Sequence, residues 1–173
     1  MMEPKFRSDR DMKGLAKIAA QQLSDPTGPS VAIFDIGGFD THADQGGDNG
    51  EHAKKLKQFD DVIGTLRKQM GKTFNNTIIA SLTEFGRTMS QNGGSGTEHG
   101  YGTAILMAGG LLPKSRVISD WPGLEQKNLF EGRDLNSSID ARSVYASILA
   151  RVLESDHQKI VKDAFFNSDL PDM

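Results

Sequence analysis

Short apolar runs alternate with longer amphipathic segments along this chain, and this alternation restricts its fold more than any other feature. Residues 31–34 (Val-Ala-Ile-Phe) are bounded by turn residues and predict a buried strand. Residues 51–69 carry apolar side chains at helical spacing, which predicts a helix of about five turns. Residues 76–82 predict a second buried strand. A strand, a helix and a strand with short connections form a βαβ unit, whose strands pair in parallel.

The remaining segments extend this pattern. Residues 103–108 predict a third strand, and amphipathic periodicity predicts helices over residues 11–23, 139–154 and 157–166. A chain of 173 residues is long enough for one domain with its own hydrophobic core. We therefore predict an α/β fold, a mostly parallel sheet flanked by helices, in a single domain of residues 1–173.

Composition argues against several functions and narrows the metal chemistry. The net charge of −3 and the lack of a basic run give no argument for binding of nucleic acid. No apolar stretch approaches the length of a membrane span, and residues 1–10 lack the apolar core of an export signal. The chain has no cysteine, so any metal site must use oxygen and nitrogen ligands.

Three glycine-flanked islands carry acids and histidines. Residues 37–42 (Gly-Gly-Phe-Asp-Thr-His) and 83–87 (Thr-Glu-Phe-Gly-Arg) each follow a predicted strand, and residues 96–100 (Gly-Thr-Glu-His-Gly) precede the third. Open α/β sheets build their sites at the carboxyl ends of strands, and acid plus imidazole is a ligand set for a divalent metal. We therefore predict one site that draws ligands from all three islands.

Each island also has a purely structural interpretation. Asp40 and His42 suit a metal pair, but taken alone they are explained better by an Asx-turn with a solvent-facing histidine. Glu84 is a metal-ligand candidate and Arg87 an oxyanion clamp, whereas an ion pair between them would only staple the turn. His99 either faces the same site or is incidental to a mobile loop. The coincidence of all three islands favours the metal site.

Two further observations bear on catalysis. The segment Gly94-Ser95-Gly96 lacks the spacing of a nucleophile elbow, and no other serine stands in such a context. Asp140 lies at the start of the last long helix, where its charge favours the helix dipole, and Arg142 either pairs with Asp140 or reaches the site.

Five motifs occur in a fixed order: residues 37–42, Glu-Phe-Gly-Arg-Thr at 84–88, residues 96–100, Trp-Pro-Gly-Leu at 121–124, and Asp-Ala-Arg followed by Val-Tyr at 140–145. With these motifs the chain resembles the "domain of unknown function 1501" family of bacterial proteins, from the first predicted helix to Leu153. That family is grouped with the alkaline phosphatase-like and sulfatase-like superfamily. Superfamily members bind divalent metals at the carboxyl edge of a mostly parallel sheet and hydrolyse phosphate or sulfate esters.

The resemblance implies a partial alkaline phosphatase-like fold, a small anionic ester as substrate, and a divalent metal: zinc first, with manganese or calcium as alternatives. Asp40 and His42 correspond to an acid-and-histidine metal pair, and His99 is similar to the late histidine that completes one metal site. Residues 83–86 look like the strand-end Asp-His-Gly of the superfamily. Glu84 keeps a group that binds metal, whereas Phe85 does not.

Family members are longer and begin with an export signal, so the resemblance implies a C-terminal half and a periplasmic or exported location. A cytoplasmic location stays open, because this chain shows no signal. A missing first half would leave an exposed sheet edge, which a homo-oligomer would cover. Two functions and one purely structural explanation therefore remain open. The functions are a metal-dependent ester hydrolase and a non-catalytic metal-binding or assembly module of an exported protein. In the structural explanation, the three islands only maintain the geometry of their loops.

Overall fold

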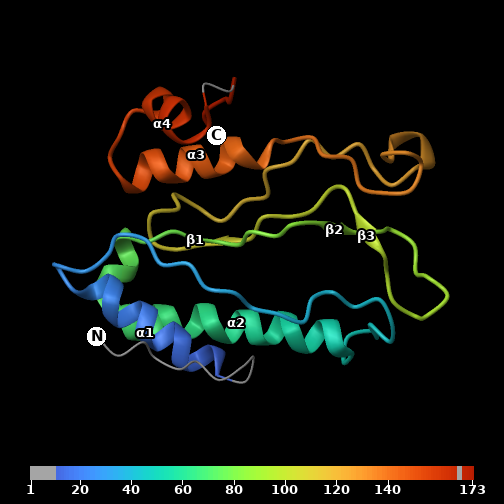
Figure 1. Ribbon diagram of the computed structural model, residues 1–173, viewed down its shortest axis with the longest axis horizontal. Coiled ribbons are helices and arrows are strands. Elements are labelled where there is room, and N and C mark those ends of the chain that lie inside the picture. The colour runs from blue at the N-terminus through green and yellow to red at the C-terminus, as the bar shows by residue number, and fades with distance from the viewer. Residues whose placement is uncertain (1–10, 167–168) are drawn as a thin grey trace. The chain divides into compact units, whose positions relative to one another are not determined.

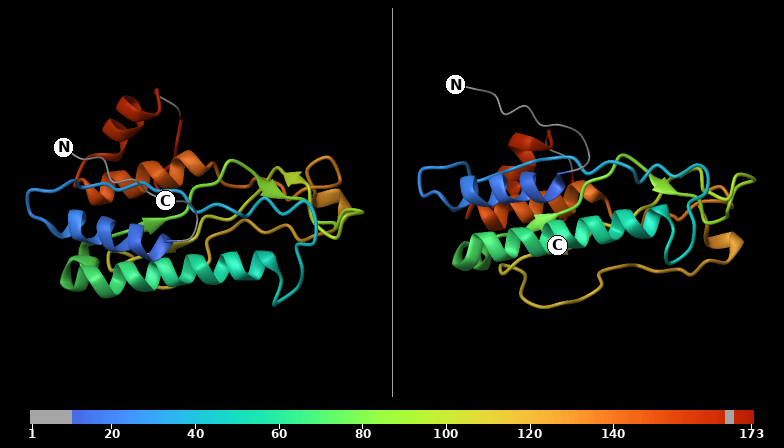
Figure 2. Two further views of the ribbon diagram at one scale, coloured as in Figure 1. Left: turned by 60° about the horizontal axis from the view of Figure 1, so that its bottom comes forward. Right: turned by 90° about the horizontal axis from the view of Figure 1, so that it is seen from below.

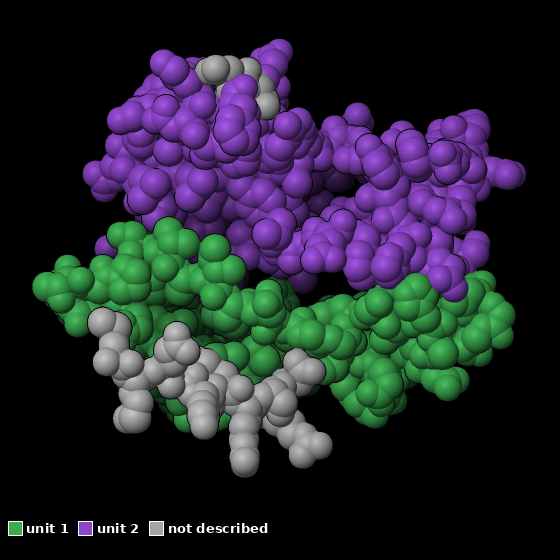
Figure 3. All heavy atoms as spheres, viewed as in Figure 1, with its two compact units in different colours: residues 1–75, 91–97 green, residues 76–90, 98–173 purple. Residues whose placement is uncertain are grey.

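The computed structural model describes residues 11–166 and 169–173. Two compact units divide the chain (Figure 3): unit 1 is Met1–Asn75 with Gln91–Thr97, and unit 2 is Asn76–Ser90 with Glu98–Met173. The prediction of a single domain over residues 1–173 stays a prediction. The prediction that residues 1–10 carry no export signal lies outside the described residues.

Unit 1 is built on two helices that confirm the predicted periodicity, α1 (Met12–Ser24) and α2 (Glu51–Met70). They lie side by side in both views of Figure 2. Small side chains on α1 allow a close approach to larger apolar ones on α2, and the buried set is Met12, Ala16, Ala19, Ala20, Val62, Leu66 and Met70. α2 is terminated by Gly71, which has a positive φ of 54° and is the first residue of a short 3-10 helix, η1 (Gly71–Asn76).

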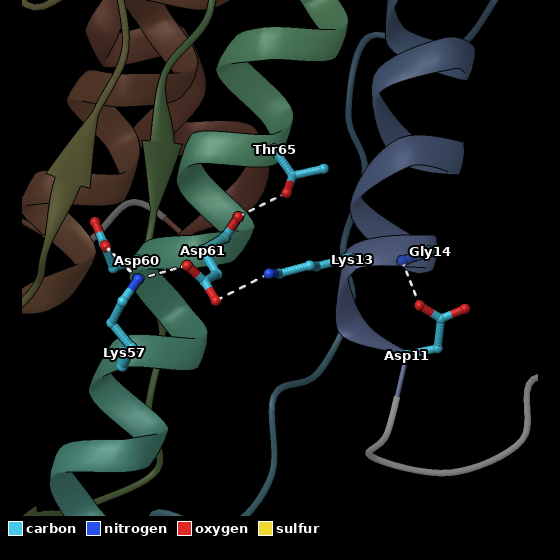
Figure 4. Close-up of polar contacts among 7 residues, drawn as sticks. All are labelled: Asp11, Lys13, Gly14, Lys57, Asp60, Asp61 and Thr65. Carbon is cyan, nitrogen blue, oxygen red and sulfur yellow. Dashed lines mark hydrogen bonds and ion pairs between the residues drawn. The ribbon is translucent and has the colours of Figure 1, made fainter. Parts of the chain in front are cut away.

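Polar contacts join the two helices at their solvent edge (Figure 4). The Lys13 ammonium lies 3.1 Å from Asp61 Oδ2, and Lys57 from the preceding turn of α2 also pairs with Asp61. Hydrogen bonds from Lys57 and Lys13 hold the pKa of Asp61 below its ordinary value. Asp11 caps α1 by accepting a hydrogen bond from the Gly14 N–H at 2.8 Å.

The first predicted strand, residues 31–34, differs from expectation. The segment forms no ladder with any described residue, and Ile33 is 87% exposed. The apolar run predicts a strand from local composition, but a strand also needs a partner for its backbone N–H and C=O groups. This segment has no ladder partner in the described part of the chain. The prediction of a buried strand over residues 31–34 is therefore wrong for this structure.

The described residues of unit 2 contain four short strands in two antiparallel ladders (Figure 1). β1 (Ile79–Ala80) pairs with β4 (Met107–Ala108), and β2 (Gly86–Arg87) pairs with β3 (His99–Gly100). Between the ladders, residues 81–85 face 101–106, so one strand carries an extra residue, as at a β-bulge.

The pairing of the second and third predicted strands is therefore antiparallel. Antiparallel strands need only a reversal of the chain, whereas parallel strands need a crossover, usually a helix. The segment between them holds no helix; it runs out through β2, turns at residues 91–97 and returns through β3. No parallel pair occurs among the described residues, so the mostly parallel sheet and the alkaline phosphatase-like fold stay predictions from the sequence.

Two helices complete unit 2, α3 (Ala141–Val152) and α4 (His157–Ala164), close to their predicted ranges. A short 3-10 helix, η2 (Gln126–Asn128), precedes them. The buried side chains of Ala146, Val161 and Leu170 form a small core beside α4. The Tyr145 hydroxyl donates to the Ser81 carbonyl at 2.8 Å, which fastens α3 to the residue after β1, and burial raises the pKa of Tyr145.

Asp140 lies at the start of α3, as predicted, and it also caps the helix by accepting a hydrogen bond from the Arg142 N–H at 2.9 Å. The Arg142 guanidinium also pairs with the same carboxylate, with 2.6 Å between Nη2 and Oδ2. This contact lowers the pKa of Asp140 and confirms the local pair for Arg142, while a reach of Arg142 into the site stays a prediction. Among the described helices, none combines the length and apolar character that crossing a membrane requires.

Candidate functional site

The first island places an acid and an imidazole in contact on unit 1. The Thr41 N–H donates to the Phe39 carbonyl at 3.0 Å, which makes a three-residue γ-turn centred on Asp40. Asp40 Oδ1 lies 3.0 Å from His42 Nε2, and each side chain is about half exposed, at 52% and 44%. The predicted pair is thus confirmed as a pair of neighbouring side chains.

The backbone on either side of His42 is held by the segment 91–97 of the same unit. The Thr97 N–H donates to the Thr41 carbonyl at 3.2 Å, and Asn92 Nδ2 donates to the His42 carbonyl at 2.9 Å. The Asp44 N–H donates to the Gly94 carbonyl at 3.0 Å. Segment 91–97 therefore holds the backbone of the Asp40–His42 turn, through main-chain hydrogen bonds and the Asn92 side chain.

Gln45 adds a third support beneath this turn. Its Oε1 accepts hydrogen bonds from the hydroxyls of Thr41 and Thr97, each at 2.8 Å. Thr97 is buried, so this hydrogen bond satisfies a hydroxyl that solvent does not reach. The two segments approach so closely that a Cβ on Gly96 would collide with the backbone of Thr41 and His42.

The spacing of the Asp40 and His42 ligand atoms fits a divalent metal. Zinc bonds of about 2.0–2.2 Å in a tetrahedral site place two ligand atoms about 3.3 Å apart. The observed 3.0 Å between Asp40 Oδ1 and His42 Nε2 is close to that value. Oxygen and nitrogen donors are also the set that a chain without cysteine must use. The two residues therefore suit a shared ion as well as each other.

The second and third islands meet in unit 2 across the β2–β3 ladder. Arg87 is the register partner of His99, so these two side chains lie on the same face. Phe85 precedes Arg87 by two residues, and period-two alternation predicts the same face for it. Its ring indeed contacts both: it stacks on His99 with 3.7 Å between ring centroids, and Arg87 Cζ lies 5.7 Å from its centroid.

Glycines occupy the positions that this close pairing requires. Gly86 faces Gly100 in the ladder, and a Cβ on Gly86 would collide with the Gly102 carbonyl oxygen. A Cβ on Gly100 would lie 2.6 Å from the Arg87 carbonyl, closer than side chains are found. The buried Thr88 continues the pairing, because its N–H donates to the Glu98 carbonyl and its Oγ1 accepts from the Glu98 N–H.

Of the predicted site residues, Asp40 and His42 thus lie together on unit 1, and the ligand candidate His99 lies beside the predicted oxyanion clamp Arg87 on unit 2. Glu84 is exposed on unit 2, and no hydrogen bond or ion pair is recorded for it within the described part of the chain. The alternative of a Glu84–Arg87 ion pair is therefore not observed there. A role for Glu84 as a metal ligand stays a prediction.

Sequence reasoning missed the residues that hold these groups in place. Gln45, Asn92 and Thr97 fix the Asp40–His42 turn through contacts across about 50 positions of sequence, which no local pattern reveals. Phe85 stood out only as a group that cannot bind metal. Its position two residues before Arg87 was the one available signal that it shares a face with the site.

The described residues define a protein of helices and short antiparallel ladders, with an exposed acid–imidazole pair on a glycine-flanked turn and an imidazole beside a partly exposed guanidinium on the β2–β3 ladder. The chain belongs to the DUF1501 family, described as proteins of unknown function, whose model matches residues 7–165. No curated protein matches the chain, and no solved structure does.

We expect Gly96→Ala to destabilise the Asp40–His42 turn. Its Cβ would meet the backbone of Thr41 and His42, and overpacking of this kind costs about 1–3 kcal/mol. Gly93→Ala is the matched control, because no atom lies within 4 Å of its Cβ position. Urea unfolding of both variants measures the difference. Equal stability of the two variants would show that segments 41–45 and 91–97 do not pack as described.

Proposed function

We propose that this chain carries a divalent-metal site and hydrolyses small phosphate or sulfate esters. Asp40 and His42 are its first two ligands, His99 its third, and Glu84 an additional ligand. Arg87 binds the anionic substrate. The observation that supports the proposal most directly is the 3.0 Å separation of Asp40 Oδ1 and His42 Nε2 on a turn fixed by backbone hydrogen bonds.

The covalent chain supports His99 as the third ligand. Thr97 is hydrogen-bonded to the Thr41 carbonyl, and His99 follows it by two residues. Two residues span at most about 7 Å even when extended. This limit follows from chain connectivity alone, and it keeps the backbone of His99 within a side chain's reach of the Asp40–His42 turn.

A divalent ion in this site would supply Lewis acidity toward an ester oxygen and lower the pKa of a bound water. The chain's own residues would orient the reactants. Arg87 presents a planar guanidinium that matches the oxygens of a phosphate or sulfate. With no serine in a nucleophile-elbow context, direct attack by water is the simplest route to hydrolysis.

We expect the double variant His42→Ala/His99→Ala to lose metal uptake, because it removes both imidazole ligands. Wild-type protein in zinc at one hundred times its dissociation constant should gain about 2.7 kcal/mol of stability, and the variant none. Elemental analysis and thermal unfolding with zinc, manganese or calcium measure this. His157→Ala is the control, since His157 lies in α4. Unchanged metal stoichiometry in the double variant would refute the site. A wild-type protein that binds no metal would favour the explanation that the three islands only maintain the geometry of their loops.

The alternative is a non-catalytic metal-binding or assembly module of an exported protein. The absence of a recognisable nucleophile and the apolar Phe85 within the second island favour it. A periplasmic or exported location belongs to both proposals and rests on the family resemblance. Turnover separates the two proposals, because both of them retain the metal.

We expect Arg87→Gln to lower ester hydrolysis by about a hundredfold, a typical loss when one charge-stabilising donor is removed. Its zinc stoichiometry should not change, because Arg87 is not a ligand. A panel of phosphate and sulfate esters, tested with metal-loaded protein, measures the rate. Stoichiometric zinc in the wild type without turnover on any ester would contradict hydrolysis and support the non-catalytic module.

We also propose that the chain self-associates through residues 31–34. These residues are apolar and form no ladder among the described residues, and Ile33 is 87% exposed; exposed apolar side chains of this kind favour association with another chain. Ile33→Lys should therefore shift the protein toward monomer in light scattering over a concentration series. Val117→Lys, at a position 91% exposed, is the control. A wild type that stays monomeric throughout would rule out this association.

A further inference from the structure

Phe85 contacts two polar side chains of the β2–β3 ladder, the His99 imidazole and the Arg87 guanidinium. Its ring lies 3.7 Å from the His99 ring, centroid to centroid, and the two planes are inclined by 9°. Arg87 Cζ lies 5.7 Å from the same Phe85 centroid, within the range of a cation–π contact. One apolar side chain thus contacts both the imidazole and the guanidinium of the proposed site.

We propose that Phe85 is a positioning residue that holds the His99 imidazole in the orientation required of a metal ligand. This inference rests on the proposed metal site and adds a residue to it. Phe85 itself offers no ligand atom, so its effect acts through His99.

The geometry of the stack explains how an apolar ring would serve this role. His99 is an exposed side chain on a short strand, and two side-chain torsions set the direction of its imidazole ring. Parallel stacking covers one face of the imidazole and fixes its plane. A metal approaches a histidine nitrogen in the plane of the ring, so the covered face does not compete with the ligand atoms.

The ladder fixes the place of Phe85 as well. Arg87 and His99 are register partners, and Phe85 follows the same face two residues before Arg87. Gly86 between them permits the close backbone approach on the other side. The order Phe-Gly-Arg in one strand opposite His-Gly in the other therefore brings the three side chains together.

The test compares zinc affinity in Phe85→Leu, Phe85→Tyr and Phe130→Leu by isothermal titration calorimetry of metal-free protein. Leucine cannot stack, so Phe85→Leu should bind zinc about tenfold more weakly, at the lower end of losses for residues that support a ligand. Tyrosine keeps the stack and should restore the affinity. Phe130→Leu is the matched control, because Phe130 forms a similar stack with Tyr101 in the same unit, at 4.1 Å.

A second measurement in the metal-free protein examines the stack directly. The ring protons of His99 should resonate upfield in the wild type, because they lie over the Phe85 ring, and should return to ordinary shifts in Phe85→Leu. Wild-type zinc affinity in Phe85→Leu, or an equal loss in Phe130→Leu, would overturn the positioning role alone. A wild type that binds no zinc would overturn the metal site itself, and this result is visible without any Phe85 variant.

Discussion

The antiparallel pairing of the segments around β2 and β3 is the constraint on which the candidate chemistry of unit 2 depends. It makes Arg87 and His99 partners and places Phe85 beside them. The pairing requires glycine at positions 86 and 100, because a side chain at either would meet backbone. The glycines of the second and third islands are therefore explained by packing alone, while the side chains beside them are not.

The chain that connects β2 to β3 also holds the conformation of the first island, residues 37–42. Residues 91–97 form the reversal between β2 and β3, and they supply the donors that hold the turn around Asp40 and His42. A change in this reversal would therefore affect both ends of the proposed site. This dependence explains why residues far apart in sequence have to be fixed together, whichever function they serve.

The sequence predicted what depends on local periodicity and missed what depends on distant partners. The helices α1 to α4 follow from apolar spacing of 3.6 residues, and the Asp40–His42 contact follows from a spacing of two within one turn. Strand direction could not be read in the same way, because residues 76–82 and 103–108 have equally apolar runs in either pairing. The stack of Phe85 on His99 depends on a register that only the folded ladder defines.

The strongest alternative to a metal site is that the contact between Asp40 and His42 only stabilises the turn. Both side chains are about half exposed, and an exposed ion pair contributes only about 0–1 kcal/mol. The turn already has hydrogen bonds from Thr97 and Asn92 to its main chain, together with the Gln45 contacts beneath it. The Asp40–His42 contact would therefore add little stability to a loop that these hydrogen bonds already hold. A ligand pair gains more from such a loop, because its two donor atoms reach 3.0 Å before any ion binds.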